Sequence, residues 1–350
     1  MKKFFTSWKK LILILLGLTV IGTLWFNLHI FSPGSLKELY ADQREEENVE
    51  EDDELISVGF CQIGSESVWR TANSNSIQNT FTEKNGFFLR FANARQKQEN
   101  QIKTIRKYIS QKVDYIVLAP VVEYGWETVL SEARDANIPV IIVDRMVEVK
   151  DDSLYTAFVG TNMVDEGRKA GEWLEEYCEE QGKKNGLNIV ILTGTEGSTA
   201  EIGRTEGFMN VAGRHPEWNI LESRDGDFTT AKGKEIMQDY ISKYSEIDVV
   251  ISQNDDMTFG VIEALDEAEI SHGPQGKVAV ISYDGSKQAL LMVRDGEINA
   301  DVECNPIQGE YIAEIIRKHK SGEEIERFNF MEERLFTIYN VNGYISTRTY

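Results

Sequence analysis

The side chains of this protein that are best suited to chemistry stand just after apolar segments. The run PVIIV, residues 139–143, is typical of a strand buried on both faces, and Asp144 and Arg145 follow it at once. The groups that follow other apolar runs are Trp69 with Arg70, Thr161 with Asn162, Asn254 with Asp255, and Asp284. In open α/β sheets, ligands bind beyond the carboxyl ends of the strands. The recurrence predicts one shared binding cleft.

Taken singly, each group also has a structural interpretation. An aspartate after a strand, such as Asp256, is often the N-cap of the next helix. The pair Asp284–Gly285 is ordinary turn chemistry. Asp144 with Arg145 also fits a structural ion pair. Recurrence at several strand ends favours the binding interpretation over coincidence.

The chemistry of the set suits a sugar. Carboxylates and amides accept hydrogen bonds from vicinal hydroxyls, and a guanidinium donates two in a fixed plane. An aromatic ring such as Trp69 offers an apolar face to the C–H side of a sugar. A nucleotide would need a phosphate loop, but residues 193–208, TGTEGSTAEIGRTEGF, contain neither G-K-[ST] nor G-x-G-x-x-G. We therefore expect a hydroxyl-rich ligand.

No motif marks a catalytic centre, a metal site or a cofactor site. The sequence has no G-x-S-x-G elbow, no H-E-x-x-H and no kinase signature. The four histidines are isolated, and Cys61, Cys178 and Cys304 form neither a C-x-x-C motif nor a disulfide framework. Carboxylate pairs leave a glycosidase open by composition, but no acid is marked as its proton donor. We expect a non-enzymatic protein without metal or cofactor.

The composition separates an N-terminal leader from a globular remainder. Four lysines precede an apolar run, residues 11–31, of about the length that spans a bilayer. A retained anchor and a cleaved signal both fit this pattern, and either one exports the remainder. Residues 41–54 are an acidic run, expected to be a solvated linker. The net charge of −21 argues against binding to nucleic acid.

From residue 55 onward the sequence predicts alternating strands and helices. The expected strands are 55–60, 87–94, 115–120, 139–144, 157–162, 188–194, 249–255 and 277–285. The expected helices are 67–84, 98–111, 126–137, 167–177, 235–244 and 259–268. The strands are continuous apolar runs, which is typical of parallel sheets covered on both faces. Two successive series predict an α/β fold with two doubly wound lobes.

Several sequence strings occur in the order seen in a known family. They are VGFCQIGSESVWR (58–70), QKQENQIK (96–103), DYIVLAPV (114–121), PVIIVDR (139–145), GRTEGF (203–208), QNDDM (253–257) and SYDG (282–285). On these strings the chain resembles the type I periplasmic sugar-binding proteins related to ribose-binding protein, and among them the galactofuranose-binding branch most of all. The resemblance covers residues 55 to 335 and thus most of the chain.

The resemblance implies two Rossmann-like lobes that are joined by three crossover strands and close over one monosaccharide by a hinge motion. The expected parts are an anchor or signal segment (1–34), an acidic linker (35–54), an N-terminal lobe (55–159 with 305–335) and a C-terminal lobe (160–304 with 336–350). The implied ligand contacts are Glu66, Trp69, Arg70, Asp144, Arg145, Asn162, Arg204, Asn254, Asp255, Asp284 and, in the crossover string ECNP, Asn305 or Glu303.

We therefore expect an exported protein that binds galactofuranose or a related monosaccharide and delivers it to the permease of an ABC importer. The alternative is a sugar sensor, tethered to the outer face of the cytoplasmic membrane, that signals to a histidine kinase. A transcription repressor shares the two-lobed core but needs an N-terminal helix-turn-helix, where this chain has its apolar run. A glycoside hydrolase would release sugar from glycosides.

Overall fold

The computed structural model describes residues 55–182 and 186–350 of the chain. The anchor or signal segment and the acidic linker expected from the sequence lie outside these residues. Within the described ranges, none of the helices combines the length and the apolar character needed to cross a membrane.

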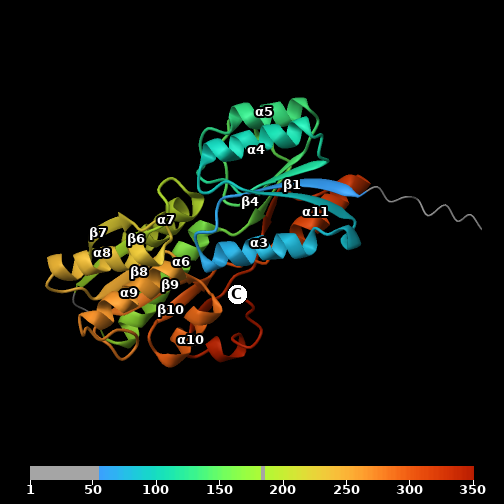
Figure 1. Ribbon diagram of the computed structural model, residues 1–350. Helices are drawn as coiled ribbons and strands as arrows, with labels where there is room; N and C mark the ends of the chain where they lie inside the picture. Colours follow the sequence, from blue (N-terminus) through green and yellow to red (C-terminus); the bar gives the residue numbers. More distant parts are fainter. Residues whose placement is uncertain (1–54, 183–185) are drawn as a thin grey trace, which may run out of the picture. The chain divides into compact units, whose positions relative to one another are not determined.

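Residues 56–160 together with β11 from the last part of the chain build a six-stranded parallel sheet in the order β11-β5-β4-β3-β1-β2. Its strands are β1 (Ile56–Gln62), β2 (Phe87–Asn93), β3 (Tyr115–Leu118), β4 (Val140–Asp144), β5 (Ala157–Gly160) and β11 (Phe328–Phe330). The helices of this lobe are α3 (Val68–Thr80), α4 (Gln98–Ser110), α5 (Glu127–Asp135) and α11 (Gly309–Ser321), with short 3-10 turns at Glu83–Asn85 and Asp152–Leu154. Figure 1 shows α4 and α5 on one side of the sheet and α3 and α11 on the other.

A second six-stranded sheet has the order β12-β10-β9-β8-β6-β7. Its strands are β6 (Leu187–Thr193), β7 (Trp218–Asp225), β8 (Val249–Ser252), β9 (Ala279–Asp284), β10 (Ala300–Glu303) and β12 (Leu335–Thr337). Only the pairing of β12 with β10 is antiparallel among these described strands. The helices that follow in chain order are α6 (Met163–Glu180), α7 (Thr199–Ala212), α8 (Thr230–Lys243), α9 (Asp255–Glu267) and α10 (Lys287–Asp295), with a 3-10 turn at Val341–Gly343.

The continuous apolar runs of the strands are explained by burial on both faces. In β4, Ile141 and Val143 pack into a core with Ile312 of α11, whereas Ile142 between them packs into a separate core with Leu130 of α5. Successive side chains of a strand point to opposite faces, so every position must be apolar when both faces are covered. The doubly wound α/β fold predicted from the sequence is confirmed.

The helices of the second lobe approach one another unusually closely. A Cβ atom on Gly207 of α7 would collide with the carbonyl oxygen of Val164 in α6, and one on Gly167 of α6 would collide with the carbonyl oxygen of Arg204 in α7. Helices α8 and α9 meet in the same way at Gly233 and Gly260. Glycine is required at these contacts because the two backbones touch.

The chain passes between the two lobes three times. The first crossover joins β5 to α6, the second joins β10 to α11, and the third joins β11 to β12. The crossover segments are residues 160–163, 303–309 and 330–335. Their number agrees with the three crossovers expected from the sequence. The exact lobe boundaries given above stay a prediction.

Candidate functional site

A small cavity lies where the carboxyl ends of the two sheets face each other. Its volume is about 30 Å³. The residues that line it are Glu66, Ser67, Trp69, Arg70, Asp144, Arg145, Met163, Ala200, Arg204, Phe228, Asn254, Asp284 and Cys304. These positions come from both lobes and from two crossovers, so the fold builds one site from segments far apart in the sequence.

Eight of the predicted contacts line this cavity, and three do not. Asn162 is exposed and caps α6, where its Oδ1 accepts from the amide of Asp165 at 3.2 Å. Asp255 is turned into the second lobe, where it accepts from the hydroxyl of Ser282 at 2.6 Å. Its other oxygen accepts from the amide of Ser286 at 2.7 Å.

The crossover residues Asn305 and Glu303 also lie outside the lining. Asn305 accepts from the amide of Ile307 through its own side chain at 2.9 Å. Glu303 is buried in an ion pair with Arg348 at 2.7 Å. Both side chains therefore organise the crossover, while Cys304 between them contributes to the cavity wall.

A buried charge network fills the first-lobe side of the cavity. Arg70 Nε donates to Glu66 Oε1 at 2.9 Å, and Arg70 Nη2 lies 2.7 Å from Asp144 Oδ2. Arg145 stands 3.9 Å from the same Asp144 oxygen and donates to the carbonyl oxygen of Val121 at 2.9 Å. Burial and the neighbouring Arg70 lower the pKa of Arg145 to about 10, against the opposing effect of Asp144 and Glu66. The network therefore combines two cations and two carboxylates away from bulk water.

Three buried polar atoms of this network have no hydrogen-bond partner: Glu66 Oε2, Asp144 Oδ2 and Arg145 Nε. Asp144 Oδ2 is nevertheless paired with Arg70 Nη2 at 2.7 Å, so only Glu66 Oε2 and Arg145 Nε are left without a close partner. Unpaired buried polar atoms are uncommon in native proteins and each costs about 1–3 kcal/mol. An acceptor and a donor on two residues that line one cavity match a hydroxyl group, which both donates and accepts.

The second-lobe side is organised around Arg204. Its Nε donates to Glu166 Oε2 at 2.6 Å, its Nη2 lies 3.3 Å from Asp284 Oδ1, and its Nη1 donates to the carbonyl oxygen of Gln253. Burial raises the pKa of Asp284 well above its ordinary value, although Arg204 acts in the opposite direction. Arg204 is thus fixed on three sides, with its guanidinium plane set by protein groups.

Three residues of the cavity wall have a positive φ angle. Asp144 ends β4 with a φ of 65°, Asp284 ends β9 with a φ of 114°, and Phe228 has a φ of 58°. Positive φ is uncommon outside glycine and is unfavourable above all for a bulky residue such as phenylalanine. Such strain persists where the surrounding structure enforces it, often at ligand sites. It turns the side chains of equivalent strand ends in the two lobes toward the same space.

Two aromatic side chains frame the charged groups. Trp69 donates through Nε1 to the carbonyl oxygen of Cys304 at 2.6 Å, which joins α3 to the second crossover. The guanidinium of Arg70 lies 4.6 Å from the Trp69 ring, and that of Arg145 lies 5.3 Å from the Phe228 ring. The sequence pattern does not predict Phe228 as a site residue, because it stands alone in the polar string DGDFTT. Its positive φ, which the sequence does not reveal, is what marks it.

Direct contacts join the two lobes around the cavity. Val68 at the start of α3 donates its amide to Asp256 Oδ2 at 3.1 Å. The amide of Met146 donates to Thr199 Oγ1 at 2.7 Å. Asn254 caps α9 through the amide of Met257, so Asp256 does not serve as the N-cap of that helix. Asp256 instead accepts from the first turn of α3, where the helix dipole favours a negative charge.

Asp256 gives a pH-dependent prediction. Burial, with a smaller contribution from Glu66, raises its pKa from 3.8 to about 6. The folded protein therefore holds this proton to a higher pH than the unfolded chain, and its contribution to stability falls as the pH rises from about 4 to 6. Two pKa units correspond to about 2–3 kcal/mol. Asp256→Asn should flatten the dependence of Tm on pH in this window and raise Tm at pH 7.

The matched control is Asp135→Asn, at an exposed carboxylate of the first lobe. It should leave the slope of Tm against pH as in the wild type. An unchanged slope in Asp256→Asn would show that Asp256 is not the titrating group.

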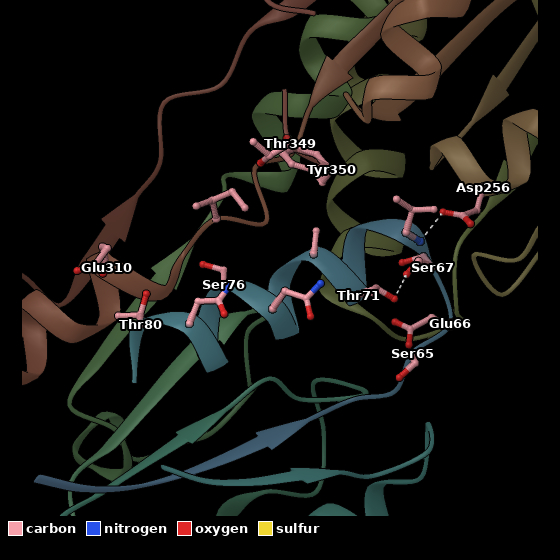
Figure 2. Close-up of a pocket in the computed structure, with 15 residues that line it drawn as sticks. Ser65, Glu66, Ser67, Thr71, Ser76, Thr80, Asp256, Glu310, Thr349 and Tyr350 are labelled. Carbon is pink, nitrogen blue, oxygen red and sulfur yellow. Dashed lines mark hydrogen bonds between the residues drawn. The ribbon is translucent and has the colours of Figure 1, made fainter. Parts of the chain in front are cut away.

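A larger open pocket of about 770 Å³ lies along another side of α3 (Figure 2). Figure 2 shows Ser67, Thr71, Ser76 and Thr80 along the helix, with Thr349 and Tyr350 across from them. Its lining is mostly small hydroxyl and amide side chains, and among the described residues Glu66 Oε2 is its one buried polar atom without a partner. The convergent unpaired groups therefore favour the smaller cavity as the binding site.

Two doubly wound lobes, three crossovers and a polar cavity between the lobes define a type I periplasmic binding protein. The chain belongs to the periplasmic binding protein domain family, which matches residues 58–324. The resemblance identified from the sequence strings is confirmed.

Individual relatives agree with this assignment. The chain is 40% identical over 285 residues to the galactofuranose-binding protein YtfQ of Escherichia coli K12, covering 80% of this chain and 87% of the relative. A crystal structure from Mycobacterium smegmatis in complex with β-D-fucofuranose has a TM-score of 0.79 and 36% identity, covering 83% of this chain and 94% of that one. The arabinose-transporter component of Shewanella sp. ANA-3, bound to α- and β-L-arabinofuranose, has a TM-score of 0.78 and 38% identity, covering 84% and 95%.

Proposed function

We propose that the chain binds one monosaccharide in its furanose form within the inter-lobe cavity and delivers it to an ABC importer. The three relatives above are named for, or bound to, galactofuranose, fucofuranose and arabinofuranose. The periplasmic binding protein family also supports an exported location, and the apolar run at residues 11–31 supplies a means of export.

The observation that carries this proposal is that the buried atoms Glu66 Oε2 and Arg145 Nε, on two residues of the cavity lining, have no hydrogen-bond partner. A sugar hydroxyl donates to a carboxylate and accepts from a guanidinium, so one polyhydroxylated ring satisfies both kinds of atom. Trp69 and Phe228 add apolar faces for the C–H groups of the ring. The expected ligand contacts are the eight predicted residues in the lining together with Phe228.

Entry of a sugar requires movement. The cavity volume of about 30 Å³ is far smaller than a monosaccharide. Direct hydrogen bonds close the lobes around it, among them Val68 to Asp256 and Met146 to Thr199. We therefore propose that the lobes open by bending at the three crossovers and close again around the ligand.

The ring form can be tested with two deoxy sugars. 5-Deoxy-D-galactose lacks O5 and so cannot close into a pyranose, whereas 4-deoxy-D-galactose lacks O4 and cannot close into a furanose. Binding measured by calorimetry, and the rise of Tm that a ligand of the folded state produces, should be seen with the 5-deoxy sugar alone. D-Galactose, L-arabinose and D-fucose complete the panel.

The outcomes separate the sugar class from the ring form. Binding of the 4-deoxy sugar in preference would contradict the furanose assignment while leaving a sugar-binding protein. A panel without any binding would contradict the proposed function itself. The choice between an ABC permease and a histidine kinase as the membrane partner stays a prediction, to be tested by reconstituting sugar-dependent ATP hydrolysis with the permease.

A further inference from the structure

The second and third crossovers and the first turn of α6 each contribute one possible metal ligand to a single cluster. Glu166 stands in the first turn of α6 after the first crossover, Cys304 lies in the second crossover, and Glu333 lies in the third. One carboxylate oxygen of each glutamate and the Cys304 sulfur all lie within 4.8 Å of one another. No sequence motif reveals this cluster, because its members are brought together only by the crossovers.

The cluster is buried, and one of its atoms is unsatisfied. Glu166 is fully buried and Cys304 is 2% exposed. Oε1 of Glu166 is buried and has no hydrogen-bond partner, whereas Oε2 is held by Arg204. The carboxyl group of Glu333 lies against Glu166, and two buried carboxyl groups in contact need a proton or a cation between them.

Neighbouring groups hydrogen-bond to the side chains of the cluster, as they do to the ligands of protein metal sites. Arg204 Nε donates to Glu166 Oε2 at 2.6 Å, and the amide of Asn305 donates to Glu333 Oε1 at 3.0 Å. The hydroxyl of Thr161 lies 3.8 Å from the sulfur of Cys304. In metal sites, ligating carboxylates are themselves hydrogen-bonded, which fixes their orientation and raises metal affinity.

The local charge favours a cation. Glu166, Glu333 and Asp284 surround a single guanidinium, that of Arg204. Lys169 is nearby, but its ammonium donates to the backbone oxygen of Glu333 and pairs with Asp165. Burial, followed by the charge of Glu166 and a hydrogen bond with it, raises the pKa of Glu333 well above its ordinary value. The excess acid must be neutralised by protons or by a bound cation.

We propose that Glu166, Cys304 and Glu333 bind a divalent transition-metal ion of the Zn²⁺ class. A thiolate together with carboxylates excludes Mg²⁺ and Ca²⁺ as preferred ions and suits Zn²⁺, which takes three protein ligands and a fourth from water. The Cys304 thiol loses its proton to solvent as the sulfur–metal bond forms, so binding releases a proton and strengthens with rising pH.

The ion would join the second and third crossovers to the start of α6, which follows the first crossover. Glu166 also holds Arg204 in the wall of the sugar cavity, so the ion and the sugar should strengthen each other's binding by the same factor. This coupling rests on the proposed function, whereas the metal site itself does not.

Cobalt titration of the full chain without sugar tests the site. Co²⁺ bound through a thiolate gives a sulfur-to-metal charge-transfer absorption in the near ultraviolet, and Zn²⁺ should displace it. Cys304→Ser should abolish this absorption, whereas Cys61→Ser, at a buried thiol of the first lobe, should leave it unchanged. Glu333→Gln, which replaces a carboxylate by an amide of the same shape, should weaken Co²⁺ binding at least about tenfold.

The results that overturn the site are equally definite. Wild-type protein without the charge-transfer absorption, or an absorption that persists in Cys304→Ser, would refute it. If protons alone neutralise the cluster, the wild-type protein will show no charge-transfer absorption. Sugar affinity measured with and without Zn²⁺ is a separate readout: metal binding without any sugar binding would refute the proposed function and leave the metal site standing.

Discussion

Asp144→Ala is expected to weaken sugar binding at least about a hundredfold. The change removes an acceptor from the cavity and leaves Arg70 and Arg145 short of a counter-charge, because Asp144 lies 2.7 Å from Arg70 and 3.9 Å from Arg145. Truncating one member of a buried charge pair costs about 2–5 kcal/mol in binding. Calorimetry with the furanose-form sugar measures the loss.

Asp144→Asn separates binding from folding. Asparagine tolerates the positive φ of 65° at this position, so the backbone should be kept while the charge is lost. Asp239→Ala, at an exposed carboxylate paired with Arg224, is the matched control and should bind sugar as the wild type does. Normal sugar affinity in Asp144→Ala, with an unchanged circular dichroism spectrum, would remove Asp144 from the binding site.

Gly207→Ala is expected to lower Tm by about 6–12 °C. The added methyl group meets the carbonyl oxygen of Val164 and the amide of Arg168, which are backbone atoms of α6 and cannot rotate away. Overpacking of this kind costs about 3 kcal/mol, and each kcal/mol shifts Tm by about 2–4 °C in a domain of this size. Thermal unfolding followed by circular dichroism measures the change.

Gly343→Ala supplies the control, because a Cβ atom there meets nothing within 4 Å. It should change Tm by about 1 °C or less, as surface substitutions generally do. An equally small change in Gly207→Ala would mean that α6 and α7 separate at little cost. Since Glu166 and Arg204 sit on these two helices, such a separation should also appear as altered sugar affinity.

The fold could be predicted from the sequence where burial leaves a repeated pattern. Strand β4 is apolar at every position from Val140 to Val143 because both faces are covered. Strand β7 was missed for the opposite reason: Trp218–Asp225 lies at the edge of its sheet and is largely half-exposed, so its polar residues hide the strand. Helix α9 begins at Asp255, ahead of the predicted 259, because Asn254 caps it within the string that had been assigned to a strand.

The site was predictable only as far as strand ends define it. Asp144 and Asp284 follow β4 and β9 directly, and both line the cavity. Asp255 is an expected ligand contact because it also follows an apolar run. In the structure it is the first residue of α9, and its carboxylate is turned toward Ser282. Phe228 lies in a loop between β7 and α8, where only the three-dimensional course of the chain brings it to the cavity.

Because β11 pairs with β5, the first lobe needs a strand from the last part of the chain to complete its sheet. Phe328 pairs with Phe158 and Phe330 with Gly160, so the edge strand of the first sheet comes from nearly the last part of the chain. Helix α11, whose Ile312 and Ile316 fill the first core, also comes late. Most of the second lobe is one continuous stretch between these partners and can collapse through nearer contacts. We expect the first lobe to remain incomplete until the last part of the chain has been synthesised, after the second lobe has begun to fold.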